Sequence, residues 1–329
     1  MRQPLILPNP KILTIVKMYL KRYFIFGVLC ITFMQCGNAK SDQYNVSAKK
    51  VLSIAPAPAL QIPEKTVKTY PMLESLVTLT IAGHKVDIRT PQKTDKQALA
   101  SGDVEGNIIV LPGWSFSKED WCNKSSLCKK ALAKKYRLIL PEMSKSVYSA
   151  KFYPQTRKDW QKYPDLNWVV NEMIPALQKK YGILLENQKN FLLGLSTGAR
   201  GVVAIGMAAP KVFSAGAALS GDYDPPKMPT DRLMIGYLGS FRQYPDRWKT
   251  GPENLVYHAK KLTMGLYLGH GKQDRIVPFN QSLLLYNALK KANPDMMLKY
   301  NWVNAGHNYK YWNSEVENML RFFDDFLRG

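Results

Sequence analysis

The stretch Phe191-Leu192-Leu193-Gly194-Leu195-Ser196-Thr197-Gly198 decides the fold of this chain of 329 residues. Its first three residues form an apolar run that is typical of a buried strand. A Gly-x-Ser-x-Gly pattern follows directly, and Ala199-Arg200-Gly201-Val202 can then start a helix. A serine on such a turn adopts strained dihedral angles, and the glycines allow the neighbouring chain to pass closely. The stretch therefore predicts a strand, a sharp turn that presents Ser196, and a helix.

Similar apolar runs recur along the chain and are separated by helical stretches. Uninterrupted apolar strands that alternate with helices indicate a parallel sheet covered on both faces. We expect strands at 108–111, 138–140, 191–193, 215–219 and 266–268, and helices at 167–181, 198–209, 281–292 and 314–327. Before them, 76–81 and 84–89 alternate around Ala82-Gly83, which predicts an antiparallel β-hairpin. The expected class is α/β, a mostly parallel central sheet with helices on both faces and an N-terminal β-hairpin.

The strand, turn and helix around Ser196 resemble the nucleophile elbow of the α/β-hydrolase superfamily of serine hydrolases. The resemblance covers most of the chain from Leu76 to Phe326 and implies the α/β-hydrolase fold, with Ser196 as nucleophile. A serine hydroxyl is a poor nucleophile at neutral pH, so an imidazole must take its proton and a carboxylate must fix the imidazole tautomer. The family places these groups in the chain order Ser, acid, His.

Two downstream loops match that order. The segment Leu266 to Pro278 is a strand followed by a loop that resembles the acid-bearing loop of the family, and it makes Asp274 the expected acid. The strand at 300–303 leads to Asn304-Ala305-Gly306-His307, which makes His307 the expected base. Asp222 and Asp224, which follow the strand at 215–219, are rival acids.

Among the remaining histidines, His270 is the rival base, although its place two residues after the strand favours a supporting role in the acid loop. His84 and His258 are expected to be structural. The tetrahedral intermediate of acyl transfer needs two N–H donors. One is expected from the backbone of Thr197 and the other from Trp114, where Pro112-Gly113-Trp114 departs from the His-Gly of many family members. The Trp114 indole either lines the substrate pocket or is a packing aromatic.

The subfamily stays open. The segment 213–221 resembles the esterase branch that includes feruloyl esterases, acetylxylan esterases and S-formylglutathione hydrolases, although Gly198-Ala199 departs from its usual Gly-Gly. The segment around Asp274 and Val277-Pro278 equally resembles dienelactone hydrolases and prolyl oligopeptidases. Prolyl-peptidase relatives usually carry a large N-terminal propeller, whereas here a tether precedes the expected domain, 71–329, which begins with the hairpin. Residues 222–257 lack strand periodicity and are expected to be an insertion, either a lid over the site or surface filler.

The resemblance implies a serine hydrolase that cleaves carboxylic esters through an acyl-enzyme and needs no cofactor or metal. The expected substrate is a small-molecule or polysaccharide-linked ester. One alternative is a prolyl-peptidase-like amide hydrolase. Another is a catalytically idle module that binds an acidic glycan.

The N-terminus has the layout of an export signal. Lys21-Arg22 precede a short apolar run, which is too short to span a bilayer. Cys36 ends this run and resembles a bacterial lipoprotein cleavage site, so residues 1–35 are the expected signal segment and Cys36 the expected lipid acceptor. Ordinary cleavage and an uncleaved anchor are the alternatives, and Met18 is an alternative start. We expect an exported, periplasmic or cell-surface lipoprotein anchored to the membrane.

The rest of the composition fits that location. Residues 36–70 are polar and rich in Pro and Ala, which is typical of a flexible tether. Cys122 and Cys128 are expected to form a disulfide in an oxidising compartment, with a pair of free thiols as the alternative. A metal site is not expected, since no His or further Cys lies nearby in the sequence to complete it. The formal net charge is +21, but the basic residues are scattered, and no nucleic-acid motif is present. No nucleic-acid partner is expected.

Overall fold

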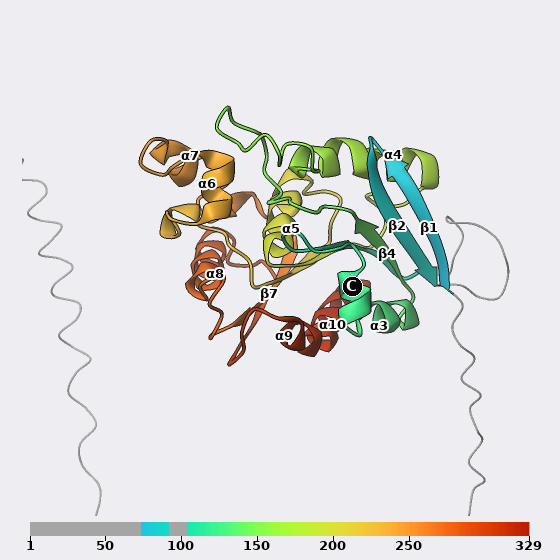
Figure 1. Ribbon diagram of the computed structural model, residues 1–329. Coiled ribbons are helices and arrows are strands. Elements are labelled where there is room, and N and C mark those ends of the chain that lie inside the picture. Colours follow the sequence, from blue (N-terminus) through green and yellow to red (C-terminus); the bar gives the residue numbers. More distant parts are fainter. Residues whose placement is uncertain (1–73, 92–103, 329) are drawn as a thin grey trace, which may run out of the picture. The chain divides into compact units, whose positions relative to one another are not determined.

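The computed structural model describes residues 74–91 and 104–328. Within them, eight strands form one sheet in the order β1-β2-β4-β3-β5-β6-β7-β8 (Figure 1). The strands are β1 (Glu74–Ile81), β2 (His84–Pro91), β3 (Gly106–Leu111), β4 (Tyr136–Pro141), β5 (Asn190–Leu195), β6 (Ala215–Leu219), β7 (Gly265–Gly271) and β8 (Leu298–Val303). β2 pairs antiparallel with β1 and β4, and all other neighbours are parallel. The expected α/β-hydrolase fold is confirmed.

The N-terminal hairpin turns where the sequence predicts it. Ile81 pairs with His84, so the turn has two residues, Ala82 and Gly83. Both have positive φ, 43° and 85°, as the tight turns that suit twisted strands require. The alternation of β1 and the Ala82-Gly83 pair were therefore enough to predict this element.

Helices cover both faces of the sheet. Successive strand residues point to opposite faces, so Ile108 and Ile109 belong to different core clusters, as do Leu192 and Leu193. The cluster of Ile109 and Leu192 includes η1 (Trp168–Met173), α4 (Ile174–Tyr181), α5 (Thr197–Ala208) and α8 (Asn280–Ala292). The cluster of Ile108 and Leu193 includes α2 (Asp120–Lys124), α3 (Leu127–Ala133), α9 (Tyr309–Ser314) and α10 (Val316–Leu327).

Two predicted helices differ in detail from the structure. The segment predicted at 167–181 begins as the π-helix η1 and continues as α4, with Pro175 in its first turn. Proline has no N–H to donate to a preceding turn, which suits a change of helix type there. The helix predicted at 314–327 is preceded by a further short helix, α9, because the Asn308 side chain accepts from Tyr311 N at 3.1 Å and caps it.

The segment expected as an insertion is helical and has its own core. It contains η2 (Pro225–Lys227), α6 (Arg232–Leu238) and α7 (Pro245–Lys249), and it ends before η3 (Ala259–Lys261). A third cluster of buried residues joins α6 and α7 to the segment between β4 and η1: Val147, Trp160, Met234, Tyr237, Leu238 and Trp248. Trp114, from the loop after β3, packs against this cluster.

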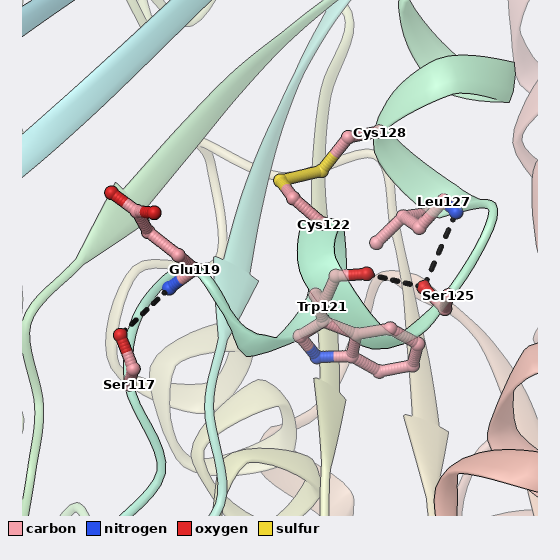
Figure 2. The surroundings of a disulfide bond; sticks show 7 residues. All are labelled: Ser117, Glu119, Trp121, Cys122, Ser125, Leu127 and Cys128. Atoms are coloured by element: carbon pink, nitrogen blue, oxygen red, sulfur yellow. Dashed lines mark hydrogen bonds between the residues drawn. A yellow bond between two sulfur atoms is a disulfide. The ribbon is translucent and has the colours of Figure 1, made fainter.

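Cys122 and Cys128 form the expected disulfide, which joins α2 to α3 (Figure 2). Between them, the Ser125 hydroxyl donates to the Trp121 carbonyl and accepts from Leu127 N (Figure 2). The buried Trp121 indole in turn donates to the Leu111 carbonyl at 3.4 Å, where β3 ends. The bridge therefore fixes two short helices beside the loop that leads to Trp114.

The expected signal segment 1–35, the tether 36–70 and Cys36 lie outside the described residues. In the ranges 74–91 and 104–328, no helix combines the length and the apolar character needed to cross a membrane.

Candidate active site

Ser196 lies on a tight turn between β5 and α5. Its backbone has φ 55° and ψ −125°, which a residue with a Cβ adopts only under strain. The two glycines of the motif are required by packing. A Cβ on Gly194 would lie 2.3 Å from the Gly198 carbonyl oxygen, and one on Gly198 would lie 2.4 Å from the Leu111 carbonyl oxygen. The elbow is therefore locked between its own helix and the loop after β3.

The structure brings the three residues expected for catalysis into one hydrogen-bonded array. His307 Nε2 lies 3.0 Å from Ser196 Oγ, and His307 Nδ1 lies 2.7 Å from Asp274 Oδ2. Ser196 comes from the turn after β5, Asp274 from the loop after β7, and His307 from the loop after β8. Because β5, β7 and β8 are parallel members of one sheet, their carboxyl ends meet at the same edge.

The Asp274 carboxylate is fully engaged. Its Oδ1 accepts the backbone N–H groups of Ile276 and Val277, each at 2.9 Å. Burial alone would raise the pKa of Asp274, but the hydrogen bonds from His270 and His307 and the charge of His307 outweigh it and hold this pKa below its usual range. Asp274 is therefore ionised at neutral pH, as a group that stabilises an imidazolium must be.

The rival residues occupy other places. Asp222 Oδ2 lies 3.2 Å from the Arg200 guanidinium, and Asp224 Oδ1 accepts from Asn254 at 3.1 Å. His270 is buried and contacts Asp274 rather than Ser196. His84 packs edge-on against Trp168, 5.2 Å between ring centroids, as expected of a structural histidine.

The two expected oxyanion donors flank the elbow. Thr197 is the first residue of α5, where a helix N–H has no partner within the helix. In the loop after β3, Ser115 N donates to the Ser144 carbonyl and Phe116 N to the Gly113 carbonyl. Within the described ranges, neither the Thr197 nor the Trp114 amide donates to another protein group. Both are therefore free to bind a substrate oxygen.

The Trp114 ring is half-buried and packs on aromatic residues of the third cluster. Its centroid lies 4.7 Å from that of Trp160 and 6.5 Å from that of Tyr237, both edge-on. The indole packs on these aromatic residues, and the contact places the insertion beside the loop that flanks Ser196.

Sequence reasoning missed Arg200. This side chain, four residues after Ser196 on α5, is fully buried, with Asp222 Oδ2 at 3.2 Å and Glu253 Oε2 at 2.9 Å. Glu253 also accepts from the Ser149 hydroxyl and the Ala150 N–H. Asp222 and Glu253 lie near the two ends of the insertion, so Arg200 ties both ends to the elbow helix. The available signal was an arginine inside the apolar run that follows the elbow.

An open polar cavity of about 560 Å³ lies beside the loops of Asp274 and His307, and Lys272, Gln273, Asp274, Arg275 and Gly306 line it. The part of the chain that the structure describes contains no group of three or more His, Cys, Asp or Glu side chains that could hold a metal ion. The array of Ser196, His307 and Asp274 suits nucleophilic attack by a serine that is activated by an imidazole.

Solved structures of low sequence identity share this fold. Fluorophosphonate-binding serine hydrolase F of Staphylococcus aureus aligns with a TM-score of 0.60 and 16% identity over 77% of this chain and 99% of that chain. The S-formylglutathione hydrolase of Staphylococcus aureus aligns with a TM-score of 0.58 and 15% identity over 77% and 99%. A ferulic acid esterase aligns with a TM-score of 0.55 and 17% identity over 77% and 98%. No curated protein sequence matches the chain.

A family model also matches the sequence. The model of the prolyl oligopeptidase family matches residues 144–329, which is more than half of the chain and includes Ser196, Asp274 and His307. The chain is a serine hydrolase with the α/β-hydrolase fold, and it belongs to the prolyl oligopeptidase family.

Proposed function

We propose that this protein hydrolyses carboxylic esters through an acyl-enzyme, with Ser196 as nucleophile, His307 as general base and acid, and Asp274 as the group that orients His307. The observation that carries the proposal is the continuous array from Ser196 Oγ through His307 to Asp274 Oδ2, with steps of 3.0 and 2.7 Å. These are hydrogen-bond distances, so proton transfer between Ser196 and His307 needs no rearrangement.

The first half of the reaction forms the acyl-enzyme. Ser196 Oγ attacks the ester carbonyl carbon while its proton passes to His307 Nε2. The Asp274 carboxylate stabilises the imidazolium, and the N–H groups of Thr197 and Trp114 bind the oxyanion. The intermediate then breaks its bond to the alcohol oxygen, which takes the proton from His307.

The second half releases the acid. A water molecule gives its proton to His307 and attacks the acyl carbon, and the new oxyanion occupies the same N–H pair. The bond to Ser196 Oγ breaks, Ser196 recovers its proton from His307, and the carboxylic acid leaves. The Ser196 proton leaves with the alcohol and a proton from water replaces it, so Ser196 and His307 end in their starting protonation states and the cycle uses only groups of this chain and one water molecule.

Ester cleavage is the activity that this array supports with the fewest further requirements. An alkoxide leaves more readily than an amide nitrogen, so a site able to cleave amides also cleaves activated esters. Among proteins of this fold, one is described as a ferulic acid esterase and another as an S-formylglutathione hydrolase, and both names denote hydrolysis at an acyl carbon. We therefore propose a small acyl compound or an acylated polysaccharide as substrate.

Amide hydrolysis after proline is the second candidate, and the family match favours it. The same array would protonate an amine leaving group. A fluorogenic Xaa-Pro peptide separates the two: turnover of the peptide at a kcat/KM equal to or above that of simple esters would assign the protein as a peptidase.

We further propose that the protein works outside the cytoplasm, held by a lipid on Cys36. The apolar run before Cys36 and the Cys122–Cys128 disulfide support this location, because such bonds persist in oxidising compartments. Mass spectrometry of the membrane fraction should find a mature N-terminus at Cys36 with lipid mass. Cys36→Ser should leave an unlipidated protein. A mature chain that retains residues 1–35 would contradict the proposal.

The test of the activity uses p-nitrophenyl acetate and butyrate with the wild-type protein, Ser196→Ala and Ser314→Ala. Ser314 is exposed at the end of α9, so its variant makes the same chemical change away from the array. Turnover and labelling by a fluorophosphonate probe should vanish in Ser196→Ala and persist in Ser314→Ala. A folded wild-type protein that neither turns over esters nor takes the probe would instead be an idle binding module.

A further inference from the structure

A second histidine contacts the acid of the array. His270, the sixth residue of β7, is fully buried, and its Nε2 lies 3.3 Å from Asp274 Oδ2 and 3.0 Å from the Val277 carbonyl oxygen. Its Nδ1 lies 2.7 Å from the hydroxyl of Ser282 on α8. Asp274 Oδ2 is therefore between two imidazoles, His270 on one side and His307 on the other.

The contacts fix the tautomer of His270. A backbone carbonyl only accepts hydrogen bonds, so the proton must be on Nε2, where Val277 O and Asp274 Oδ2 share it. Nδ1 is then an acceptor and receives the Ser282 hydroxyl proton. Both ring nitrogens are satisfied in the neutral form, which suits a histidine with no exposure to solvent.

His270 completes the set of donors around the carboxylate. Oδ1 takes two backbone N–H groups from the acid's own loop, whereas Oδ2 takes only side-chain donors. Without His270, the partner of Oδ2 would be His307, whose ring must also change protonation during the reaction. A carboxylate held only through Oδ1 can tilt about its two backbone hydrogen bonds, and the tilt changes the distance from Oδ2 to His307 Nδ1.

We propose that His270 is a positioning residue, which holds Asp274 Oδ2 toward His307 by donating its Nε2 proton from the opposite side. This inference rests on the proposed function, because it assigns Asp274 as the group that orients His307. His270 itself contacts neither Ser196 nor the reacting atoms in this arrangement.

Two substitutions of His270 by amide side chains test the proposal, because Gln and Asn place their NH₂ groups at different distances from the backbone. The terminal NH₂ of Gln in His270→Gln can occupy the place of Nε2 and donate to Asp274 Oδ2. The shorter Asn in His270→Asn can occupy only the place of Nδ1, beside Ser282. Displacing a reacting group by about 1 Å can cost on the order of 100-fold, so we expect His270→Asn to lower kcat by about 10- to 100-fold and KM little. His270→Gln should recover most of that loss.

A background without the carboxylate separates positioning from general damage. In Asp274→Ala, His270→Asn should lower kcat no further, because its target is absent. His258→Gln is the control. Its histidine Nε2 lies 3.2 Å from the Thr250 carbonyl oxygen and does not contact Asp274, so this variant should leave kcat unchanged. Thermal unfolding of each variant reports whether the fold is retained.

Ser196→Ala and the fluorophosphonate probe test the proposed function, whereas the His270 variants test only the positioning of Asp274. If His270→Asn and His270→Gln lose kcat equally, or if His270→Asn is as damaging in Asp274→Ala as in the wild-type protein, the histidine is a packing residue and the proposal is overturned. A wild-type kcat in His270→Asn would overturn it as well.

Discussion

Arg200 donates to Glu253 across 2.9 Å, and neither side chain has appreciable contact with solvent. A guanidinium four residues after the nucleophile is thus held inside the protein by carboxylates from the two ends of the insertion, Asp222 and Glu253. Desolvation makes such an ion cluster a weak source of net stability. Its contacts join both ends of the insertion to the elbow helix.

Arg200→Met should destabilise the protein by about 3–5 kcal/mol, because it leaves two buried carboxylates without their cation. Chemical denaturation at neutral pH measures the loss. Arg242→Met, at an exposed position in the insertion, is the matched control and should change the free energy of unfolding by less than about 0.5 kcal/mol.

Neutralising the carboxylates as well should restore much of that stability. The triple variant Arg200→Met, Asp222→Asn, Glu253→Gln contains no buried charge in the cluster and should unfold at a higher denaturant concentration than Arg200→Met alone. If the triple variant is less stable than the single one, the penalty arises from lost packing and not from uncompensated charge.

Asp222 should make stability depend on pH. Burial raises the pKa of Asp222 to about 6 although Arg200 opposes the shift, whereas the unfolded chain has the ordinary value of 3.8. The folded state therefore holds this proton more tightly, so the contribution is complete below about pH 4 and is lost as pH rises through 6. A shift of about two units corresponds to about 3 kcal/mol.

The Asp222→Asn variant isolates this effect. Its free energy of unfolding minus that of the wild-type protein should rise by about 3 kcal/mol between pH 4 and pH 7. Asp246→Asn, at an exposed position in the insertion, makes the same chemical change away from Arg200 and is the control. A flat difference for Asp222→Asn would mean that Arg200 keeps the carboxylate ionised throughout.

The sequence predicted the residues of the Ser196, His307 and Asp274 array, but not the contacts of Arg200 or the helix α9. Ser196, Asp274 and His307 each follow a parallel strand, and the carboxyl ends of these strands meet at one edge of the sheet. Asp222 and Asp224 follow β6 at the same edge, and the resemblance of the Asp274 loop to the acid loop of the family favoured Asp274 over them. The partners of Arg200 lie 22 and 53 residues away, where no periodicity relates them. Helix α9 was missed for a related reason, since it depends on one capping side chain, Asn308, rather than on an apolar pattern.

Removing the Cys122–Cys128 bridge should cost about 2 kcal/mol, because closing so short a loop removes little entropy from the unfolded chain. The double variant Cys122→Ala, Cys128→Ala should melt at a lower temperature than the oxidised wild-type protein. Adding a reductant should lower the melting temperature of the wild-type protein and leave that of the double variant unchanged. Equal sensitivity of both proteins to the reductant would show that the two cysteines are not bonded in solution.

Asp274→Asn should lower kcat by roughly 10⁴-fold with little change in KM. Oδ1 accepts two backbone N–H groups, so the asparagine carbonyl must take that place and its NH₂ must face His307. The NH₂ group donates to His307 Nδ1 and leaves the imidazole proton on Nε2. A protonated Nε2 can no longer accept the proton of Ser196. Asp224→Asn, the same change in a carboxylate bonded to Asn254, should keep kcat within a few-fold. A larger loss in Asp224→Asn than in Asp274→Asn would assign the acid role to Asp224.

Two glycine substitutions should separate the elbow from the loop that faces it. A Cβ on Gly198 would lie 2.4 and 2.6 Å from the Leu111 and Pro112 carbonyl oxygens, so Gly198→Ala must push backbone away from backbone. That movement widens the space between the Thr197 and Trp114 N–H groups, and loss of one oxyanion donor typically costs about 10²- to 10³-fold in kcat.

Gly113→Ala is the matched substitution, because the atoms nearest its Cβ belong to side chains and not to the backbone. Its Cβ would lie 2.9 Å from Leu195 Cδ1 and 3.3 Å from Ser196 Cβ, which are side-chain atoms. Because a leucine methyl group can move further than a carbonyl oxygen, Gly113→Ala should lose less kcat than Gly198→Ala. Rates of p-nitrophenyl acetate hydrolysis and of fluorophosphonate labelling give the comparison. A wild-type labelling rate in Gly198→Ala would show that the space between the Thr197 and Trp114 N–H groups does not limit the reaction. That result would contradict their assignment as the oxyanion site.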